Sequence, residues 1–381
     1  MPVEQILTNA QVVTAQQSFI GTVLLRDGLI AAVEPGVSRL PQAQNLNGDY
    51  LLPGLVELHT DNLEKHMTPR PGVDWPSASA VLTHDAQIVA AGITTVFDAL
   101  SIGDVNPKGK RMQQLPAMLE AIAEASRSGH VRADHRLHLR CEVCHPDTLS
   151  VFRDLLEHPL VQLVSVMDHS PGQRQFAKEE KYREYYMGKY HLSEAEMLEF
   201  IAEQKANSIE FSDRYRRSIV DECHLRGLSL ASHDDATLAH AQESAGLGMS
   251  IAEFPTTYEA AQASHQLGLK VLMGAPNIVR GGSHSGNIAA AELAQLGLLD
   301  ILSSDYYPAS LLQAALLLVE QDNDYDLPRA IATVSLLPAQ AAGLTDRGEI
   351  RVGLRADLVH AQVHGAQPVI QQVWQQAKRV F

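Results

Sequence analysis

The sequence predicts a (β/α)8 barrel of the TIM type with a small β-sandwich domain built from both ends of the chain. Strand-like and helix-like segments alternate through the middle of the chain, while both ends are rich in short strands and turns. The length of 381 residues suits a large barrel with an accessory domain. A doubly wound sheet is the main alternative, but no glycine-rich dinucleotide motif follows an early strand.

The barrel is expected over residues 54–343. Helix-like stretches such as HDAQIVAAG and TYEAAQASHQLG separate the strand-like runs, and several end in glycine, a common helix C-cap. Eight short apolar runs are predicted to be the strands, at residues 54–59, 93–98, 136–142, 161–168, 228–233, 250–254, 270–274 and 300–305.

Residues 1–53 and 344–381 are expected to form the small β domain together. QILTNAQVV near the start and GEIRVGLRADLVHAQV near the end share the same strand-rich texture. The stretch RDGLI predicts a hairpin, because Asp-Gly between apolar runs is typical of a two-residue turn.

The connection formed by residues 170–227 is longer than those between the other predicted strands. Its length predicts a helical insertion. Two interpretations are open: an amphipathic hairpin that packs on the barrel, or a lid that carries basic groups over the site. The side chains behind these interpretations are Tyr182, Tyr185, Tyr186 and Tyr190 with Lys178, Lys181, Arg183 and Lys189.

The composition narrows the class of partner. A net charge of −15 argues against nucleic acid and against an anionic membrane surface, since both select a basic face. A phosphorylated small molecule needs only a local basic pocket and stays compatible. No apolar run approaches the roughly 18 residues of a membrane span. Three cysteines and the lack of a signal-peptide pattern favour the cytoplasm. The composition does not determine the oligomeric state, and a homo-oligomer is compatible with it.

Imidazoles and carboxylates stand at the expected carboxyl ends of seven of the eight strands, where the active sites of such barrels lie. These groups are the ligands that Zn²⁺, Mn²⁺ and Fe²⁺ take in proteins. The sequence therefore predicts a metal site. Its candidates are His59, Asp61, Asp98, Glu142, Asp168, His169, His233, Asp234, Asp235, Glu253 and Asp305.

His59 and Asp61 are the clearest pair. Alternate residues of a strand project to the same side, so both side chains point toward one spot. Asp98 and Glu253 are weaker candidates, because either could orient a ligand by accepting an N–H group. One of Asp234 and Asp235 is expected to be the N-cap of the helix that DDATLAHAQ begins.

Long motifs carry a family resemblance over nearly the whole chain. PGLVELHTD, GITTV, the His of the fifth strand, the Asp of the eighth and the return strand GEIRVGLRADLV resemble the amidohydrolase superfamily. HTDNLEKH, MDHSPGQRQF, SHDDAT and GAPNIVRGGSHSGN are similar to its branch that hydrolyses a ribose 1-methylphosphonate 5-triphosphate in the carbon–phosphorus lyase pathway. Most of the superfamily has His-x-His on the first strand, whereas this chain has His59-Thr60-Asp61.

The resemblance implies a metal-dependent diphosphatase that releases pyrophosphate and leaves the 5-phosphate. It implies Asp305 as the general base and Glu142 as the carboxylate that bridges two metal ions in some members. Glu253 stands where the superfamily has a sixth-strand His, so His169 could take the place of that ligand. The number of metal ions, one or two per chain, stays open. The implied metal ligands are His59, Asp61, Glu142, His169, His233 and Asp305, with Glu253 as the weaker one.

A triphosphate also requires hydrogen-bond donors. In GAPNIVRGGSHSGN, glycines stand beside hydroxyl and basic groups just before a predicted helix, which suits the binding of an anion. The alternative is an ordinary loop after the seventh strand. Arg140 stands two residues before Glu142 and should point the same way. The candidate phosphate-binding residues are Lys65, His66, Arg70, Arg140, Arg280, Ser283, His284 and Asn287.

Two other functions compete with the diphosphatase. One is an amide hydrolase or deaminase of the same superfamily, which would need few phosphate donors. The other is a non-catalytic scaffold subunit of a phosphonate-processing complex, which would not need the intact set of strand-end ligands.

Overall fold

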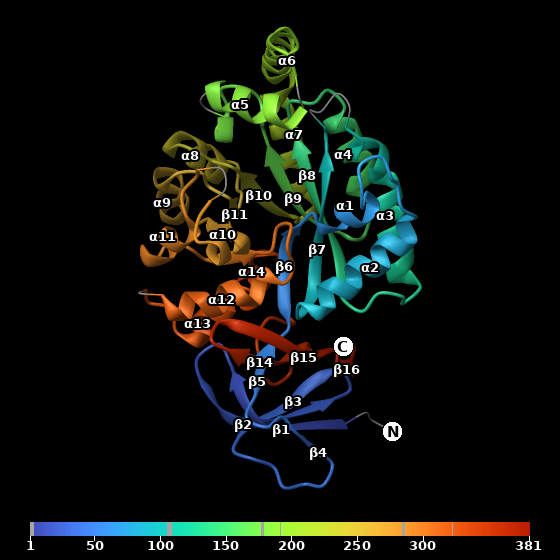
Figure 1. Cartoon of the computed structure of the whole chain (residues 1–381), viewed down its shortest axis with the longest axis vertical. Coiled ribbons are helices and arrows are strands. Elements are labelled where there is room, and N and C mark those ends of the chain that lie inside the picture. Colours follow the sequence, from blue (N-terminus) through green and yellow to red (C-terminus); the bar gives the residue numbers. More distant parts are fainter. Residues whose placement is uncertain (1–3, 105–108, 177–178, 191, 284–285, 322) are drawn as a thin grey trace. The chain divides into compact units, whose positions relative to one another are not determined.

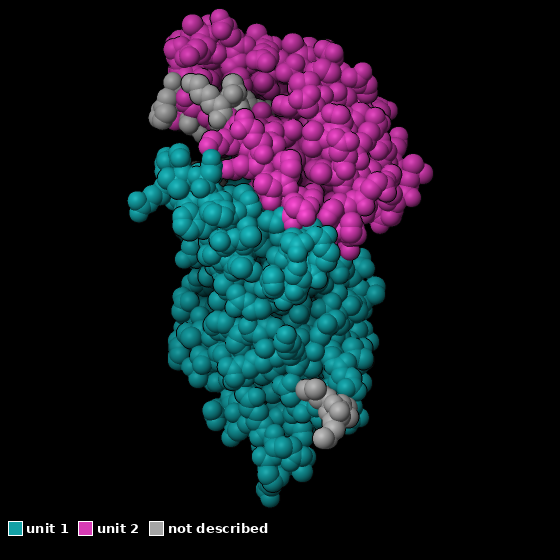
Figure 2. All heavy atoms as spheres, turned by 90° about the vertical axis from the view of Figure 1, so that its right-hand side faces the viewer, with its two compact units in different colours: residues 1–98, 121–136, 273–381 teal, residues 99–120, 137–272 magenta. Residues whose placement is uncertain are grey.

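The computed structural model describes residues 4–104, 109–176, 179–190, 192–283, 286–321 and 323–381. The chain divides into two compact units, coloured separately in Figure 2. Unit 1 comprises residues 1–98, 121–136 and 273–381, and unit 2 comprises residues 99–120 and 137–272.

The middle of the chain supplies eight strands that follow one another in a single sheet, in the order of the sequence. The eight predicted strands are all present, and the expected (β/α)8 barrel is confirmed. Within unit 1, a parallel bridge between Thr60 and Asp305 joins the first strand to the end of the last. The strands, labelled in Figure 1, are β6 (Leu55–Thr60), β7 (Ile93–Ile102), β8 (Asp134–Glu142), β9 (Val161–Met167), β10 (Ser229–His233), β11 (Ile251–Glu253), β12 (Lys270–Gly274) and β13 (Ile301–Ser303).

Helices follow most of the strands, as the alternating pattern predicts. None of those in the described residues is long and apolar enough to cross a membrane. They are α1 (Asn62–Met67), α2 (Ser77–Ala90), α3 (Arg111–Arg127), α4 (Thr148–Leu156), α7 (Asp213–Arg226), α8 (Leu238–Gly246), α9 (Tyr258–Gln266), α10 (Ala275–Arg280), α11 (Ala290–Gln295), α12 (Ser310–Glu320), α13 (Leu327–Ala332) and α14 (Leu336–Ala341).

The predicted N-cap of α8 is wrong. Neither Asp234 nor Asp235 caps this helix, because it begins later, at Leu238. The hydroxyl of Thr237 accepts a hydrogen bond from the backbone N–H of His240 and takes the capping role. The two aspartates are therefore left for other partners.

The ends of the chain form a second sheet in unit 1, in which β14 pairs with β5 although some 300 residues separate them. Figure 1 shows the red strands of the C-terminal end beside the blue ones of the N-terminal end. The domain boundaries at residues 53 and 344 stay a prediction. The strands are β1 (Glu4–Val13), β2 (Ser18–Arg26), β3 (Leu29–Pro35), β4 (Ala43–Asn45), β5 (Tyr50–Pro53), β14 (Leu358–His364), β15 (Gln367–Gln375) and β16 (Lys378–Arg379).

The predicted hairpin joins β2 to β3. Arg26 pairs with Leu29, and the two residues between them, Asp27 and Gly28, have φ values of 51° and 84°. Two left-handed residues make a tight turn that suits the twist of antiparallel strands, which explains the choice of Asp-Gly.

The helical insertion in unit 2 has an aromatic core of its own. It contains a 3-10 turn (Arg174–Phe176), α5 (Glu179–Tyr190), α6 (Glu194–Asn207) and a π-helical turn (Ser208–Ser212) that leads into α7. The core consists of Phe176, Tyr182, Tyr186, Met197, Phe200 and Ile201. These contacts pack the parts of the insertion against one another, and its packing on the barrel stays a prediction.

The basic groups of the insertion are partly paired within it. Arg183 forms an ion pair with Glu194, and Lys205 lies 2.5 Å from Glu179. Lys178 and the side chain of Lys189 lie outside the described residues. The lid interpretation therefore stays a prediction.

Candidate metal and phosphate site

In unit 1, the main chain brings His59, Asp61 and Asp305 together. The backbone N–H of Asp305 donates to the carbonyl of His59 at 3.1 Å, and that of Asp61 donates to the carbonyl of Asp305 at 3.2 Å. The Thr60 hydroxyl also donates to the Asp305 carbonyl, at 2.7 Å. His59 is buried and the two aspartates are half-buried, so three predicted ligands share one strand end.

A buried carboxylate behind them, Glu57, was not predicted. It accepts hydrogen bonds from the backbone N–H groups of His59 at 2.6 Å and Ser304 at 2.5 Å, and from the Ser303 hydroxyl at 2.8 Å. Burial raises the pKa of Glu57 to about 7 against these donors. Glu57 thus connects β6 to β13. Its position two residues before His59 could have identified it, because alternate residues of a strand project to the same side.

Three residues that follow barrel strands adopt left-handed backbone conformations. Asp234, Phe254 and Asp305 have φ values of 57°, 51° and 53°, which is uncommon outside glycine. In each case the backbone N–H bonds to a carbonyl of the neighbouring strand, so pairing across the sheet holds the turn. The acceptors are the carbonyls of Glu253, Leu272 and His59. Such strain, held by the surrounding structure, is typical of functional sites.

In unit 2, Glu142 and His169 form a close pair. The ring Nδ1 of His169 lies 2.5 Å from Glu142 Oε2, and its backbone N–H donates to Oε1 at 2.9 Å. The thiol of Cys144 also faces this carboxylate, with Sγ 3.3 Å from Oε1. The structure therefore places two predicted ligands, from the ends of β8 and β9, beside each other.

Asp234, which the sequence suggested as a helix cap, joins the imidazoles instead. Its Oδ2 lies 3.3 Å from His169 Nε2 and 3.1 Å from His233 Nδ1. Burial favours the neutral acid, yet His233 and His169 hold the pKa of Asp234 below its usual range. Burial likewise disfavours the imidazolium of His169, but Glu142 and Asp234 raise its pKa to about 10.

Asp235 has a structural partner. It forms a buried ion pair with Arg174 and accepts a hydrogen bond from the Ser244 hydroxyl at 2.9 Å. Arg174 also donates to Glu243 at 2.7 Å. Its guanidinium thereby connects the segment after β9 to α8, which holds the strand end that carries His233 and Asp234.

The donors in unit 2 have the chemistry of a cation site. One atom each of His169, His233 and Asp234 lies within 4.8 Å of the others, and the same is true of Glu142, Cys144 and Asp168. Carboxylates held ionised beside imidazoles favour a cation, which would replace the proton on His169. These side chains fit the divalent ion that the resemblance implies.

Glu253 faces a histidine that sequence reasoning missed. His138 projects to the same side of β8 as Glu142, and its Nε2 lies 3.9 Å from Glu253 and 2.8 Å from the Ser165 hydroxyl. His138 and Glu253 are fully buried. The i, i+4 spacing from Glu142 in a strand is the signal that could have found His138.

Asp98 accepts hydrogen bonds from two imidazole rings. Neither ring belongs to a predicted metal ligand, so the role of orienting a ligand stays a prediction. Its Oδ1 lies 2.7 Å from His84 Nε2, and its Oδ2 lies 2.7 Å from His135 Nδ1. His135 also contacts Asp85, at 3.4 Å. Both oxygens of Asp98 are therefore engaged by imidazoles within unit 1.

This cluster leads to a prediction on stability. Burial lowers the pKa of His135, but Asp98 and Asp85 outweigh it and raise the value to about 10. The stabilisation is fully present below the ordinary value of 6.5 and is lost as the pH rises towards 10. The free energy of unfolding in urea should therefore fall over this range. In His135→Gln the fall should be smaller; an equal fall in both proteins would contradict the raised pKa.

The predicted phosphate donors lie on short helices, on loops and, for Arg140, on a barrel strand. In unit 1, Lys65 and His66 are on α1, and Arg70 is exposed in the loop after it. In unit 2, Arg140 is half-buried on β8, and its buried Nε has no hydrogen-bond partner among the described residues. That unsatisfied donor is compatible with a role in binding phosphate.

The glycine-rich segment after β12 contains a helix in its first part. This helix, α10, begins at Ala275 and ends at Arg280, with Gly281 as a left-handed C-cap. Arg280 is exposed, and the backbone N–H of Asn287 donates to the Ser283 hydroxyl at 3.3 Å. His284 lies outside the described residues.

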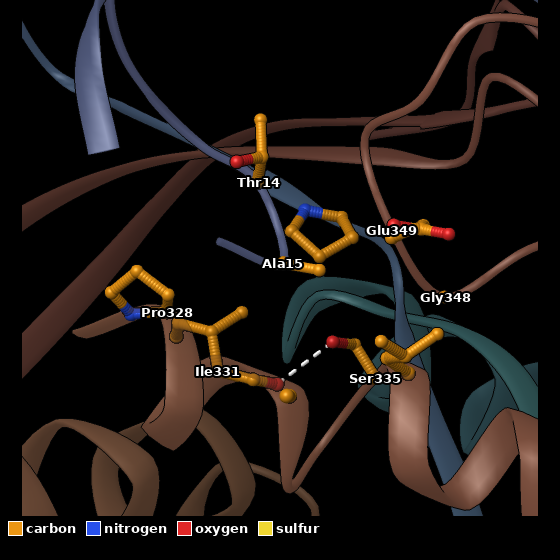
Figure 3. A pocket seen from close by; sticks show the side chains of 10 residues that line it. Thr14, Ala15, Pro328, Ile331, Ser335, Gly348 and Glu349 are labelled. Atoms are coloured by element: carbon orange, nitrogen blue, oxygen red, sulfur yellow. Dashed lines mark hydrogen bonds between the residues drawn. The ribbon is translucent and has the colours of Figure 1, made fainter. Parts of the chain in front are cut away.

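A separate small pocket in unit 1 does not resemble an anion site. Figure 3 shows that Thr14, Pro328 and Ile331 line it with Ser335 and Glu349. The Ser335 hydroxyl already donates to the Ile331 carbonyl at 2.7 Å. The negative charge of Glu349 also disfavours phosphate there.

Known proteins resemble the chain over most or all of its length. The chain matches the amidohydrolase family over residues 86–369. It is 56% identical over 377 residues to the alpha-D-ribose 1-methylphosphonate 5-triphosphate diphosphatase of Escherichia coli (strain K12), covering 99% of this chain and 100% of that protein.

Solved structures show the same fold at low identity. The 5-methylcytosine deaminase of Klebsiella pneumoniae with bound 5-fluorocytosine has a TM-score of 0.66 and 14% identity, over 99% of this chain and 97% of the other. The N-acetyl-D-glucosamine-6-phosphate deacetylase of Mycobacterium smegmatis has a TM-score of 0.65 and 16% identity, over 99% and 100%. Together, the family match, the identity to the E. coli diphosphatase and the shared barrel establish that this chain belongs to the amidohydrolase family.

Proposed function

We propose that this protein is a metal-dependent diphosphatase that hydrolyses α-D-ribose 1-methylphosphonate 5-triphosphate to the 5-phosphate and pyrophosphate. The observation that carries the proposal is the 56% identity, over the full length of both chains, to the E. coli enzyme of that name. The imidazoles and carboxylates at the strand ends support it, because hydrolysis of a polyanion requires groups that hold a cation.

Two sets of donors would hold the divalent ions, one or two per chain. The set in unit 1 is His59 and Asp61 with Asp305. The set in unit 2 comprises Glu142, His169, His233 and Asp234, with Glu253 facing His138 as the weaker candidate. A bound ion of this kind lowers the pKa of water and neutralises charge on phosphate oxygens. We propose Zn²⁺, Mn²⁺ or Fe²⁺; the carboxylate of Asp61 in place of a second imidazole favours the harder Mn²⁺.

Asp305 would act as the general base. Its main chain is fixed by hydrogen bonds to the residues of β6, and its left-handed backbone turns it out of the strand. In this role the carboxylate takes a proton from the attacking water as the new bond forms between water oxygen and phosphorus. The P–O–P link between the α- and β-phosphates breaks, which gives the 5-phosphate and pyrophosphate.

The basic groups would bind the triphosphate. Arg140 offers a planar guanidinium with an unsatisfied Nε, which suits phosphate oxygens. Lys65, Arg70 and Arg280 would add positive charge, with His66, Ser283, His284 and Asn287 as neutral donors. A phosphorylated small molecule is therefore the proposed partner, with no role for nucleic acid or membrane, and a homo-oligomer remains open.

We also place the enzyme in the cytoplasm. Cys141, Cys144 and Cys223 are buried free thiols, which a reducing compartment preserves. The proposed substrate is anionic and phosphorylated, and cells retain phosphorylated metabolites in the cytoplasm.

Phosphorus NMR of the metal-loaded protein with the 5-triphosphate tests the function. Pyrophosphate with a 5-monophosphate is the expected result. In ¹⁸O-labelled water, the isotope shift then shows which of the two products received the water oxygen, and so which phosphorus was attacked. Release of single phosphate would assign a different cleavage position. A protein that holds metal without any phosphorus turnover would favour the amide hydrolase or deaminase instead.

A further inference from the structure

A buried row of ionisable side chains in unit 1 adjoins the first residue of α1 and has no part in the chemistry proposed above. It consists of His84 and Asp85 of α2, Asp98 of β7 and His135 of β8. None of them is more than 2% exposed. Burying four ionisable groups costs free energy unless each has a hydrogen-bond or ion-pair partner. We therefore ask what role their arrangement has.

Hydrogen bonds connect the row from end to end. His84 Nε2 donates to Asp98 at 2.7 Å, and His135 Nδ1 donates to the other oxygen of Asp98 at 2.7 Å. Asp85 closes the far end, where it accepts from His135 and from the backbone N–H groups of Arg132 and Ala133 at 2.8 and 3.0 Å. The row is therefore fixed at that end by main chain.

The near end of the row holds Asn62, the first residue of α1. The Asn62 amide nitrogen lies 3.0 Å from His84 Nδ1 and 3.0 Å from Gln87 Oε1, so it donates to both. This makes His84 Nδ1 an acceptor and leaves the ring proton on Nε2, facing Asp98. The Asn62 carbonyl oxygen accepts from Lys65 Nζ at 3.3 Å. An unbroken series of bonds thus runs from the buried row to an exposed lysine.

Lys65 depends on such contacts for its position. Helix α1 has six residues, and Asp61 makes no side-chain cap hydrogen bond within the described structure. So short a helix has little stability of its own, and a lysine loses side-chain entropy when it is fixed. Lys65 is held by Asn62 and by the carbonyl of Tyr306, which leaves one of its three donors for a ligand.

The row is unlike a metal site, although two imidazoles and a carboxylate meet in it. Asn62 and Asp98 engage the two ring nitrogens of His84. Asp98 and Asp85 engage those of His135. Hydrogen bonds therefore occupy both nitrogens of each ring.

We propose that His84, Asp98, His135 and Asp85 form a positioning row that fixes Asn62 and, through it, orients Lys65 toward the triphosphate. The inference rests on the proposed function for its ligand. His84 is a positioning residue, since it acts on the substrate only through Asn62 and Lys65.

A double-mutant cycle of His84→Leu and Lys65→Met tests this role, with the affinity for inorganic triphosphate measured by calorimetry on the metal-loaded protein. Each single variant should bind about tenfold more weakly, the loss expected for one charge-assisted hydrogen bond. The double variant should bind no more weakly than Lys65→Met alone. Additive losses would overturn the proposal, because His84 would then act independently of Lys65.

Two further variants separate a positioning role from general stability. His84→Gln keeps a donor for Asp98 and serves as the partner in the cycle if the leucine variant does not fold. His360→Leu is the control, since His360 is also buried against an aspartate, Asp49, at 2.9 Å, but belongs to the second sheet. It should bind triphosphate normally and be additive with Lys65→Met.

The remaining outcomes are also decisive. Loss of one equivalent of metal in both His84→Leu and Asp98→Asn would make the row an ion site and overturn the proposal. If the wild-type protein releases no pyrophosphate, the function fails, whereas the coupling of His84 to Lys65 in triphosphate binding is still measured. Failure of the function and failure of the inference are therefore distinguishable.

Discussion

Replacing Asp305 with asparagine should lower kcat by about 1,000-fold, within the usual contribution of a general base. The amide cannot accept the proton of the attacking water. The fold should persist, because the hydrogen bonds that join Asp305 to His59, Thr60 and Asp61 use its main chain. Asparagine also tolerates the left-handed backbone with φ of 53°. Steady-state kinetics by phosphorus NMR, together with a urea unfolding curve, measures both effects.

The matched control is Asp324→Asn, which changes an exposed aspartate before α13. It should retain wild-type turnover. A folded Asp305→Asn enzyme with a kcat within tenfold of wild type would remove Asp305 from the role of base. If Asp305→Asn lost its metal as well, Asp305 would be a ligand in addition to any role as base.

The second large effect is expected for Asp61→Asn. The variant should fold, lose bound metal and lose at least about 100-fold in kcat, because a neutral amide is a poorer ligand than a carboxylate. The side chain of Asp61 makes no cap hydrogen bond in the described structure, so little stability depends on it. Metal content by mass spectrometry and kcat on the same samples are the measurements.

Asp74→Asn alters another aspartate, exposed in the loop after α1, and controls for the change in local charge. It should keep both metal and activity. Wild-type metal content and turnover in Asp61→Asn would show that the pairing of His59 and Asp61 on one side of the strand has no role in coordination. Activity restored by excess Mn²⁺ would instead support a weakened site.

Part of the candidate site could be located from the sequence because it depends on local pattern. Short apolar runs specify strands, and the carboxyl end of each strand can be located to within a few residues. Reading the next polar residues then yields His59, Glu142, His169, His233 and Asp305. The turn at Asp27 and Gly28 is equally local, since those residue types suit a left-handed backbone.

The prediction failed where two local signals compete. Aspartates before a helix are good caps, so one of Asp234 and Asp235 was expected to serve that purpose. In the structure Thr237 is nearer the first helical turn and takes the role, while Asp234 is held between two imidazoles. Sequence alone could not weigh a cap of about 1 kcal/mol against burial beside His169 and His233.

By itself, the sequence determined the barrel, the second sheet from both ends and the kinds of groups at the strand ends, because alternation and apolar runs act over a few residues. Only the tertiary structure decided which of these groups meet. His84, Asp98 and His135 are bonded across 51 residues, and Glu57 bonds to Ser303 across 246. Such partners are set by the register of packed strands and helices, and a buried polar group keeps whichever partner that packing brings within hydrogen-bond distance.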